Sequence, residues 1–215
     1  MTRLRRLPAV LPALLLLGVV GCSSSEPAAA PAPSSTVPVI VPGTPGGPNQ
    51  TLAALPSASA TVDPDDVKFL GDMMVHHTQA VQMTERAKTA AVNPKVKALA
   101  ERIRVGQQPE IEAMRQMLTA RGQTPPNLEH VEHMDHSAMP GMATPAQLTQ
   151  LGSATGKPFD TLFLTLMIKH HEGAVTMSGE QEKNGADIRV GELAQEVTVT
   201  QTKEIATMRQ LLKDL

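Results

Sequence analysis

The sequence predicts an all-α protein whose folded part is a four-helix bundle, and three observations lead to this class. N-cap residues stand directly before proline at Asp63-Pro64 and Asn93-Pro94, a pairing typical of helix starts. Apolar residues recur at helical spacing in the segments that follow, and no run shows the alternation of a strand. A shift of 94 residues superimposes the first half of this region on the second, as in a protein built from two repeated units.

Four long helices and one short helix are expected, each with its own start or stop signal. Thr144-Pro145 opens the short helix. Gly122 can end the second helix in a left-handed C-cap, and Asn184-Gly185 ends the third long helix. The expected helices span residues 63–91, 93–120, 144–152, 159–183 and 187–213.

The two repeats cover about residues 63–121 and 157–215, and each is expected to form a helical hairpin. Short connections make the helices of a hairpin antiparallel, and two hairpins related by a pseudo-twofold axis give a four-helix bundle. The spacing leaves open how the hairpins dock. The repeated histidines therefore either share one site or form two.

The first 21 residues have the proportions of a bacterial signal peptide. Arg3, Arg5 and Arg6 form a basic start, and the apolar run at 11–20 is too short to span a bilayer. The run ends in the sequence VVGC, which is similar to a lipobox, so Cys22 is expected to carry a lipid that anchors the mature chain in the membrane. An ordinary secretory signal with an incidental cysteine is the alternative.

Residues 22–62 are expected to form a disordered tether between the membrane and a folded domain at 63–215. Pro, Ala, Ser, Gly and Thr dominate this segment. Such a composition cannot bury enough apolar surface to offset the entropy of ordering the chain. A flexible tether of this length has a root-mean-square reach of about 35 Å.

Charge and composition exclude nucleic acid as a partner and limit the chemistry of any metal site. Removing residues 1–21 removes three arginines and changes the formal net charge from −2 to −5, and the chain has no Trp or Tyr on which bases could stack. Cys22 is the only cysteine, so no internal disulfide can form. Soft-metal ligands in the folded domain must therefore be thioethers rather than thiolates.

Paired histidines stand on the apolar face of the first and third long helices. At about 100° per residue, His76 and His77 fall on either side of the centre of that face, and small Ala80 allows close approach. One histidine would favour a structural role, whereas two repeated pairs favour metal ligation; the methionines are soft ligands or core filler. The candidate ligands of this inner site are Met73, His76, His77, Met83, Met167, His170, His171 and Met177.

Glu110 and Glu204 fall on the inward faces of the second and fourth long helices. A buried carboxylate is costly unless it is paired. Each glutamate can accept the N–H of a histidine whose other ring nitrogen binds metal. The alternative is a buried Glu–His ion pair that only stabilises the bundle.

The loop at 128–143 gathers histidine and methionine between the two repeats. Methionine in an exposed Gly/Pro loop has no core to fill, and a His-rich tract of this kind is typical of metal binding. A merely polar linker is the alternative. The candidate ligands of the loop are His130, His133, Met134, His136, Met139 and Met142.

Histidine and methionine without cysteine point to copper. Thioether suits Cu(I), for which Ag(I) is a chemical mimic, while structural zinc usually requires cysteine with histidine. Di-iron bundles place a glutamate three residues before a histidine, and neither His-His pair has one.

The pattern M-x-x-H-H-x-x-A-x-x-M occurs at 73–83 and again at 167–177. With Phe69 and Phe163 it resembles the domain of unknown function family 305, over about residues 63–214. The resemblance implies a four-helix, ferritin-like bundle outside the cytoplasm, in a family some of whose members are associated with copper or silver binding and copper tolerance. Met117 is matched by Leu211, so a ligand at Met117 would exist in one half only.

The sequence therefore predicts a membrane-anchored lipoprotein that binds Cu(I), sequesters it or passes it to a partner protein, and captures metal first on its loop. A copper or di-iron oxidase with its metal in the bundle core is the enzymatic alternative. A structural or partner-binding lipoprotein, in which the His-Glu network only specifies the bundle, is the third.

Overall fold

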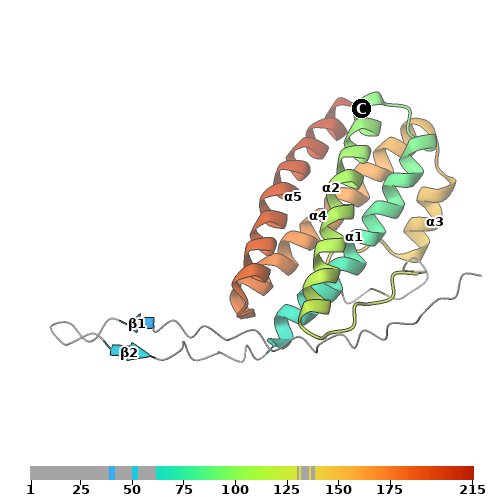
Figure 1. Cartoon of the computed structure of the whole chain (residues 1–215). Helices are drawn as coiled ribbons and strands as arrows, with labels where there is room; N and C mark the ends of the chain where they lie inside the picture. The colour runs from blue at the N-terminus through green and yellow to red at the C-terminus, as the bar shows by residue number, and fades with distance from the viewer. Residues whose placement is uncertain (1–38, 42–49, 53–61, 130, 132–135, 137–138) are drawn as a thin grey trace, which may run out of the picture. The chain divides into compact units, whose positions relative to one another are not determined.

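The computed structural model describes residues 39–41, 50–52, 62–129, 131, 136 and 139–215 (Figure 1). The chain divides into two units, Met1–Ala58 and Ser59–Leu215. The predicted signal peptide, Cys22 and most of the predicted tether lie outside the described residues. None of the helices in the described ranges is long and apolar enough to cross a membrane.

The first unit contains two short strands, β1 (Val39–Val41) and β2 (Gln50–Leu52), which pair antiparallel with Val39 opposite Leu52. Sequence reasoning found no strand signal in these six residues, which lie within the predicted tether. β1 is a run of β-branched residues, which favours an extended backbone. The run is too short to show the alternation by which strands are recognised in a sequence.

The second unit is an all-helical bundle, and its five helices confirm those expected from the sequence. Pro158 stands in the first turn of the fourth, where its missing N–H costs no hydrogen bond, so that helix begins before Phe159. The helices are α1 (Pro64–Ala90), α2 (Pro94–Ala120), α3 (Pro145–Ser153), α4 (Gly156–Asn184) and α5 (Ile188–Asp214).

Side-chain caps begin four of these helices. The carboxylate of Asp63 accepts the N–H groups of the first turn of α1, and Asn93 and Asp187 do the same for α2 and α5. Thr144 and Gln147 form a reciprocal capping box at the start of α3. Each such cap contributes about 1 kcal/mol to helix stability, and each stands where the sequence predicts a helix start.

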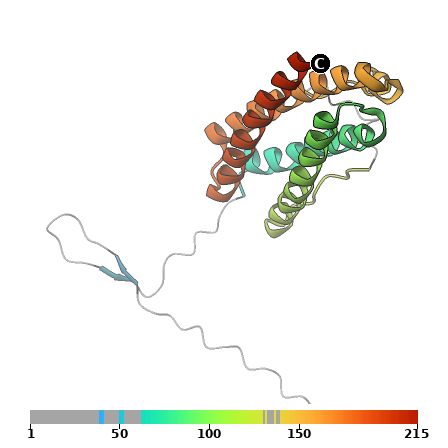
Figure 2. The same cartoon turned by 90° about the horizontal axis from the view of Figure 1, so that it is seen from above.

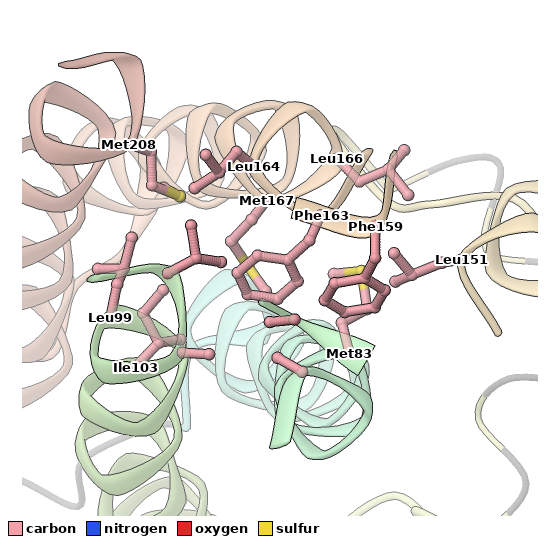
Figure 3. Close-up of a cluster of buried hydrophobic side chains, with 14 of the residues drawn as sticks. Met83, Leu99, Ile103, Leu151, Phe159, Phe163, Leu164, Leu166, Met167 and Met208 are labelled. Atoms are coloured by element: carbon pink, nitrogen blue, oxygen red, sulfur yellow. The ribbon is translucent and has the colours of Figure 1, made fainter. Parts of the chain in front are cut away.

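α1 packs along α2, α4 packs along α5, and α1 contacts α4 where the two hairpins meet (Figures 1 and 2). One apolar cluster holds Met83 with Met167, among the rings of Phe159 and Phe163 (Figure 3). A second holds Met73 and Met177. The repeat equivalents therefore exchange places, which shows that α1 and α4 run antiparallel about a pseudo-twofold axis.

Two buried carboxylates join the hairpins. Asp66 of α1 accepts the N–H of Asp187 at 2.8 Å and the side-chain amide of Gln181 at 2.8 Å, both in the other hairpin. Its repeat equivalent, Asp160 of α4, accepts the N–H of Asn93 at 2.9 Å. Each hairpin thus binds the turn of the other. Gly185 allows the close approach, since a Cβ there would lie 2.4 Å from the Asp66 carboxylate.

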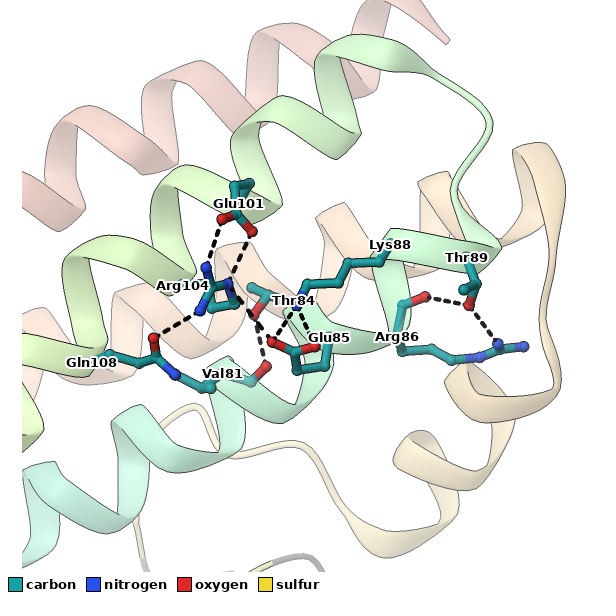
Figure 4. A network of polar contacts seen from close by, with 9 residues as sticks. All are labelled: Val81, Thr84, Glu85, Arg86, Lys88, Thr89, Glu101, Arg104 and Gln108. Atoms are coloured by element: carbon teal, nitrogen blue, oxygen red, sulfur yellow. Dashed lines mark hydrogen bonds and ion pairs between the residues drawn. The ribbon is translucent and has the colours of Figure 1, made fainter. Parts of the chain in front are cut away.

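A polar network covers the outer surface of the α1–α2 hairpin (Figure 4). Arg104 contacts Glu101 at 2.6 Å and Glu85 at 3.6 Å, and Lys88 contacts Glu85 at 2.5 Å. Exposed pairs of this kind contribute roughly 0–1 kcal/mol each. The docking of the hairpins therefore depends on the buried contacts rather than on this surface.

Replacing Asp160 with alanine should destabilise the domain by about 1–3 kcal/mol, because it removes the buried carboxylate that accepts the backbone N–H groups of Val92 and Asn93 in the α1–α2 turn. Chemical denaturation measures the free energy of unfolding. Exposed Glu196→Ala is the control, with an expected change within about 0.5 kcal/mol. Equal costs for the two variants would contradict the proposed role of Asp160.

Candidate metal centre

Four histidines lie at the middle of the bundle, where α1 contacts α4. His76 and His77 of α1, and His170 and His171 of α4, are each completely buried. The ring centroids of His76 and His170 lie 3.8 Å apart, with ring planes inclined by 38°. The two repeats therefore bring their histidines together in one layer, which the sequence spacing left open.

Each repeat pairs one histidine with the glutamate of its partner helix. His77 Nε2 lies 2.8 Å from Glu110 Oε2, and His171 Nε2 lies 2.9 Å from Glu204 Oε2. Arg102 Nε stands 3.6 Å from the other oxygen of Glu204. Because a carboxylate can only accept, Nε2 of each ring carries the proton. The lone pair is then on Nδ1.

The other histidine of the first pair is oriented by the backbone. His76 Nε2 lies 3.0 Å from the carbonyl oxygen of Pro140, so this nitrogen also donates and Nδ1 again carries the lone pair. Within the described part of the chain, Nδ1 of all four rings and Nε2 of His170 are buried without a hydrogen-bond partner. Buried polar atoms in folded proteins are usually paired, so this layer of unpaired imidazole nitrogens departs from the usual pattern.

His76, His170 and His171 are held uncharged. Burial, with a smaller contribution from His77, lowers the pKa of His76 to about 3, although the hydrogen bond to Pro140 opposes the shift. Burial and the neighbouring His76 place the pKa of His170 well below its ordinary value, against a small opposing effect of the His76 carbonyl. Burial also lowers the pKa of His171 despite Glu204. These rings are neutral at pH 7, the form in which histidine binds metal.

The histidines adjoin, but they are not arranged as a complete ligand set. The described residues contain no group of three or more His, Cys, Asp or Glu side chains placed to hold a metal ion. Metal bound in this layer would therefore need sulfur ligands or a movement of the rings. Sulfur ligands suit Cu(I), which accepts thioethers.

The four inner methionines lie in the two apolar clusters rather than between the rings. Met73 and Met167 are fully buried, Met83 is 2% exposed and Met177 is 7% exposed. Their surroundings suit core packing, so their role as metal ligands stays a prediction. The pseudo-twofold axis nevertheless places thioethers in both clusters.

The structure describes part of the predicted loop site. His136 Nε2 lies 2.9 Å from the carbonyl oxygen of Val131. Met142 is buried and Met139 packs beside it against Val75 of α1, so the premise that these methionines have no core to fill is wrong. His130, His133 and Met134 lie outside the described residues.

Residues 139–143, the strap, lie against α1 and α4 at the level of the histidines. The side-chain amide of Gln79 bonds the backbone of Ala143 twice, at 3.0 and 2.7 Å. Gly173 of α4 makes room for the strap, because a Cβ there would lie 2.0 Å from the carbonyl oxygen of Pro140. Gly141 has φ +79°, a conformation that favours glycine.

Sequence reasoning missed Gln79, and it missed the contact of Gly173 with the strap. Gln79 and Gly173 occupy equivalent positions in the two repeats. The signal in the sequence is that these two residues differ although the motif around them repeats. Gln79 holds the strap on one helix, and Gly173 admits it on the other.

The fold and the site together define the class of this protein: an all-helical bundle with a buried layer of repeated His-His pairs. The chain belongs to the family described as Domain of unknown function (DUF305), whose profile matches residues 66–212. No relative was found among curated proteins.

Solved structures of similar proteins agree with this assignment. A DUF305 fragment from Deinococcus radiodurans is 33% identical, with TM-score 0.64, over 72% of this chain and 99% of that one. A DUF305 protein from Streptomyces coelicolor, described as a candidate secreted protein, is 30% identical, with TM-score 0.63, over 70% and 93%. CopM in its Cu(II)-bound form is 30% identical, with TM-score 0.60, over 69% and 96%. CopM has also been solved with Cu(I) and with Ag.

The metal-free domain should lose stability as the pH falls below about 6.5. The folded pKa of His76 is about 3, below the ordinary value of 6.5, so the unfolded state binds more protons between these values. His76 alone should contribute a loss of about 2 kcal/mol between pH 7 and pH 5, above the range in which carboxylates titrate. Urea denaturation at the two pH values measures it.

His76→Leu is the matched variant for this measurement, since it keeps an apolar side chain of similar size and removes the titrating ring. The loss between pH 7 and pH 5 should shrink by about 2 kcal/mol in this variant. An unfolding free energy that is the same at both pH values in the unaltered protein would contradict the buried neutral state of His76.

Proposed function

We propose that this chain is an extracytoplasmic lipoprotein that binds Cu(I), or Ag(I) in its place, in a four-helix, ferritin-like bundle, and sequesters the metal or passes it to a partner protein. One observation carries the proposal: buried, unpaired imidazole nitrogens from both repeats meet in one layer. A structural role for the rings would call for hydrogen-bond partners at these atoms.

The donor set suits a soft monovalent metal. Nδ1 of each ring is available as a ligand, and the neutral rings need no deprotonation before they bind. Glu110 and Glu204 accept the Nε2 protons of His77 and His171, which fixes the orientation of those rings and increases their basicity. Sulfur atoms are available from Met73, Met83, Met167 and Met177, one pair in each adjoining apolar cluster.

Two further observations support this assignment. CopM, a similar protein, is known in Cu(II)-bound, Cu(I)-bound and Ag-bound forms. The loop residues His130, His133, Met134 and His136 add a second group of ligand types to the same domain. We assign this loop the first capture of metal, with burial of Met142 limiting its part in it.

The location follows from the N-terminal sequence. Residues 1–21 act as a signal peptide, Cys22 carries the lipid, and residues 22–62 tether the domain 63–215 to the membrane surface. The similar Streptomyces protein described as secreted supports an extracytoplasmic location.

Replacing His76 and His170 together by leucine should abolish the tight Cu(I) site. Leucine fills the space of the ring without a ligand nitrogen. His76→Leu also removes the donor to the Pro140 carbonyl oxygen, so the stability of the metal-free variant is measured beside its affinity. Anaerobic titration with Cu(I) against a competing chelator measures affinity. A loss of at least about 100-fold is expected, corresponding to roughly 2.7 kcal/mol.

Lys169→Leu, on the exposed face of α4 beside the histidines, is the control and should bind Cu(I) as the unaltered protein does. Unchanged affinity in the double histidine variant would exclude the inner site. Oxygen consumption by the copper-loaded protein would instead favour the oxidase.

Replacing Glu110 and Glu204 by glutamine should weaken Cu(I) binding by about 10–100-fold without removing a ligand, because loss of an oriented carboxylate behind a metal-bound histidine has this effect. Exposed Glu112→Gln on α2 is the control. If the glutamates only stabilise the bundle, the double variant will lose stability while its Cu(I) affinity stays unchanged.

A further inference from the structure

A cleft of about 480 Å³ lies beside the strap, between the N-terminal part of α1 and the C-terminal part of α4. Two thioether side chains line it, Met139 from the strap and Met177 from α4. Sequence reasoning assigned these methionines to different sites, one in the loop and one in the core. The fold brings them into the same cleft.

The cleft carries negative charge. The carboxylates of Asp65, Asp72 and Glu180 line it together with one cation, Lys68, which pairs with Asp72. Asp65 and Glu180 are exposed, so the cleft is reached by solvent. A cleft lined mainly by one sign of charge concentrates ions of the opposite sign and speeds their binding.

The pseudo-twofold axis supplies an internal comparison, because a second cleft, of about 320 Å³, lies between the C-terminal part of α1 and α3 and contains the repeat equivalents of Met177 and Glu180. There Met83 stands in the place of Met177, and Arg86 stands in the place of Glu180. The α3 leucines Leu148 and Leu151 line this second cleft, whereas the strap lines the first.

The two ends therefore differ in chemistry while they share a fold. The α3 end combines one thioether with leucines and a guanidinium group, and Arg86 is bound to the carbonyl oxygen of Gly152 at 3.0 Å. The strap end combines two thioethers with three carboxylates. The helices at the α3 end pack together without a counterpart of Met139 or of the three carboxylates. These residues of the strap end are therefore not needed for helix packing.

The strap is a wall shared by the cleft and the histidine layer. Pro140 lines the cleft, and its carbonyl oxygen accepts the hydrogen bond from His76 Nε2. A cation held in the cleft therefore lies one residue away from the buried imidazoles. No comparable contact joins the α3 cleft to a histidine in the described part of the chain.

We propose that this cleft is a second binding site for a monovalent soft cation, Cu(I) or Ag(I), held by the sulfur atoms of Met139 and Met177, and that it is the entrance to the histidine layer. The binding step stands by itself, whereas the entrance role rests on the proposed function. Asp65, Asp72 and Glu180 attract the cation, and the strap separates the two sites.

Ag(I) is the probe, because it shares the ligand preference of Cu(I) without redox chemistry. In the full chain labelled with ¹³C at the methionine methyl groups, the signals of Met139 and Met177 should shift with the first equivalents of Ag(I). The variants Met139→Leu and Met139→Leu/Met177→Leu should each bind one Ag(I) fewer and load the histidine layer at least about 10-fold more slowly. The single variant leaves all four inner-site methionines in place, so its loss of Ag(I) belongs to the cleft.

The control is Met114→Leu/Met208→Leu, a pair of fully buried methionines that are equivalent in the two repeats and line neither cleft. It should keep both the stoichiometry and the rate. Unshifted Met139 and Met177 signals, or an unchanged stoichiometry in the Met139→Leu/Met177→Leu variant, would overturn the cleft site. Loss of one Ag(I) at an unchanged loading rate would overturn its role as the entrance.

The histidine variant separates this proposal from the proposed function. In His76→Leu/His170→Leu the Met139 and Met177 signals should still shift with Ag(I), because the cleft does not use the imidazoles. If those signals shift and the histidine variant binds as much metal as the unaltered protein, the histidine site fails while the cleft site stands. If only the histidine variant loses metal, the cleft site fails and the proposed function stands.

Discussion

Two buried carboxylates determine how the hairpins dock, and the positions of the inner side chains follow from that docking. Asp66 and Asp160 each bind backbone N–H groups in the turn of the other hairpin. Hydrogen bonds from backbone N–H groups to a buried carboxylate are directional, and leaving those groups unpaired is costly. They therefore fix how far α1 and α4 slide along one another. This register sets His76 beside His170 and divides the methionines between two clusters.

Docking of the two hairpins keeps four imidazole rings buried, which is energetically unfavourable for polar groups. Four imidazoles are buried in contact with apolar clusters, and burial disfavours their charged forms. The surrounding fold keeps His76, His170 and His171 neutral. Glu110, Glu204 and Pro140 accept hydrogen bonds from Nε2 of three of the four rings. Burying the Nδ1 atoms without partners costs free energy. Binding a ligand that accepts their lone pairs would offset this cost.

Local features of the fold followed from the sequence, and long-range ones did not. Asp63, Asn93 and Thr144 predict helix starts because capping is decided within four residues. The pairing of Glu110 with a histidine follows from two inward faces in one hairpin. The contact of His76 with His170 could not be predicted, because it depends on the contacts of Asp66 and Asp160 with the turn of the other hairpin, which no local pattern indicates. The strap and the β1–β2 pair depend on contacts that leave no periodic signal.

Mismatches between the repeats carry information that the matches do not. The matched residues, such as the His-His pairs, build one pseudo-symmetric layer, and symmetry alone gives that layer no preferred side. Gln79 faces its equivalent Gly173 across the strap, and Glu180 stands where the other repeat has Arg86. The Glu180–Arg86 replacement makes the strap-end cleft more negative, while the strap supplies a second thioether there and α3 supplies leucines to the other cleft. A cation approaching the two clefts therefore meets a lower electrostatic energy at the strap end, so the proposed direction of metal entry rests on departures from the repeat rather than on the repeat itself.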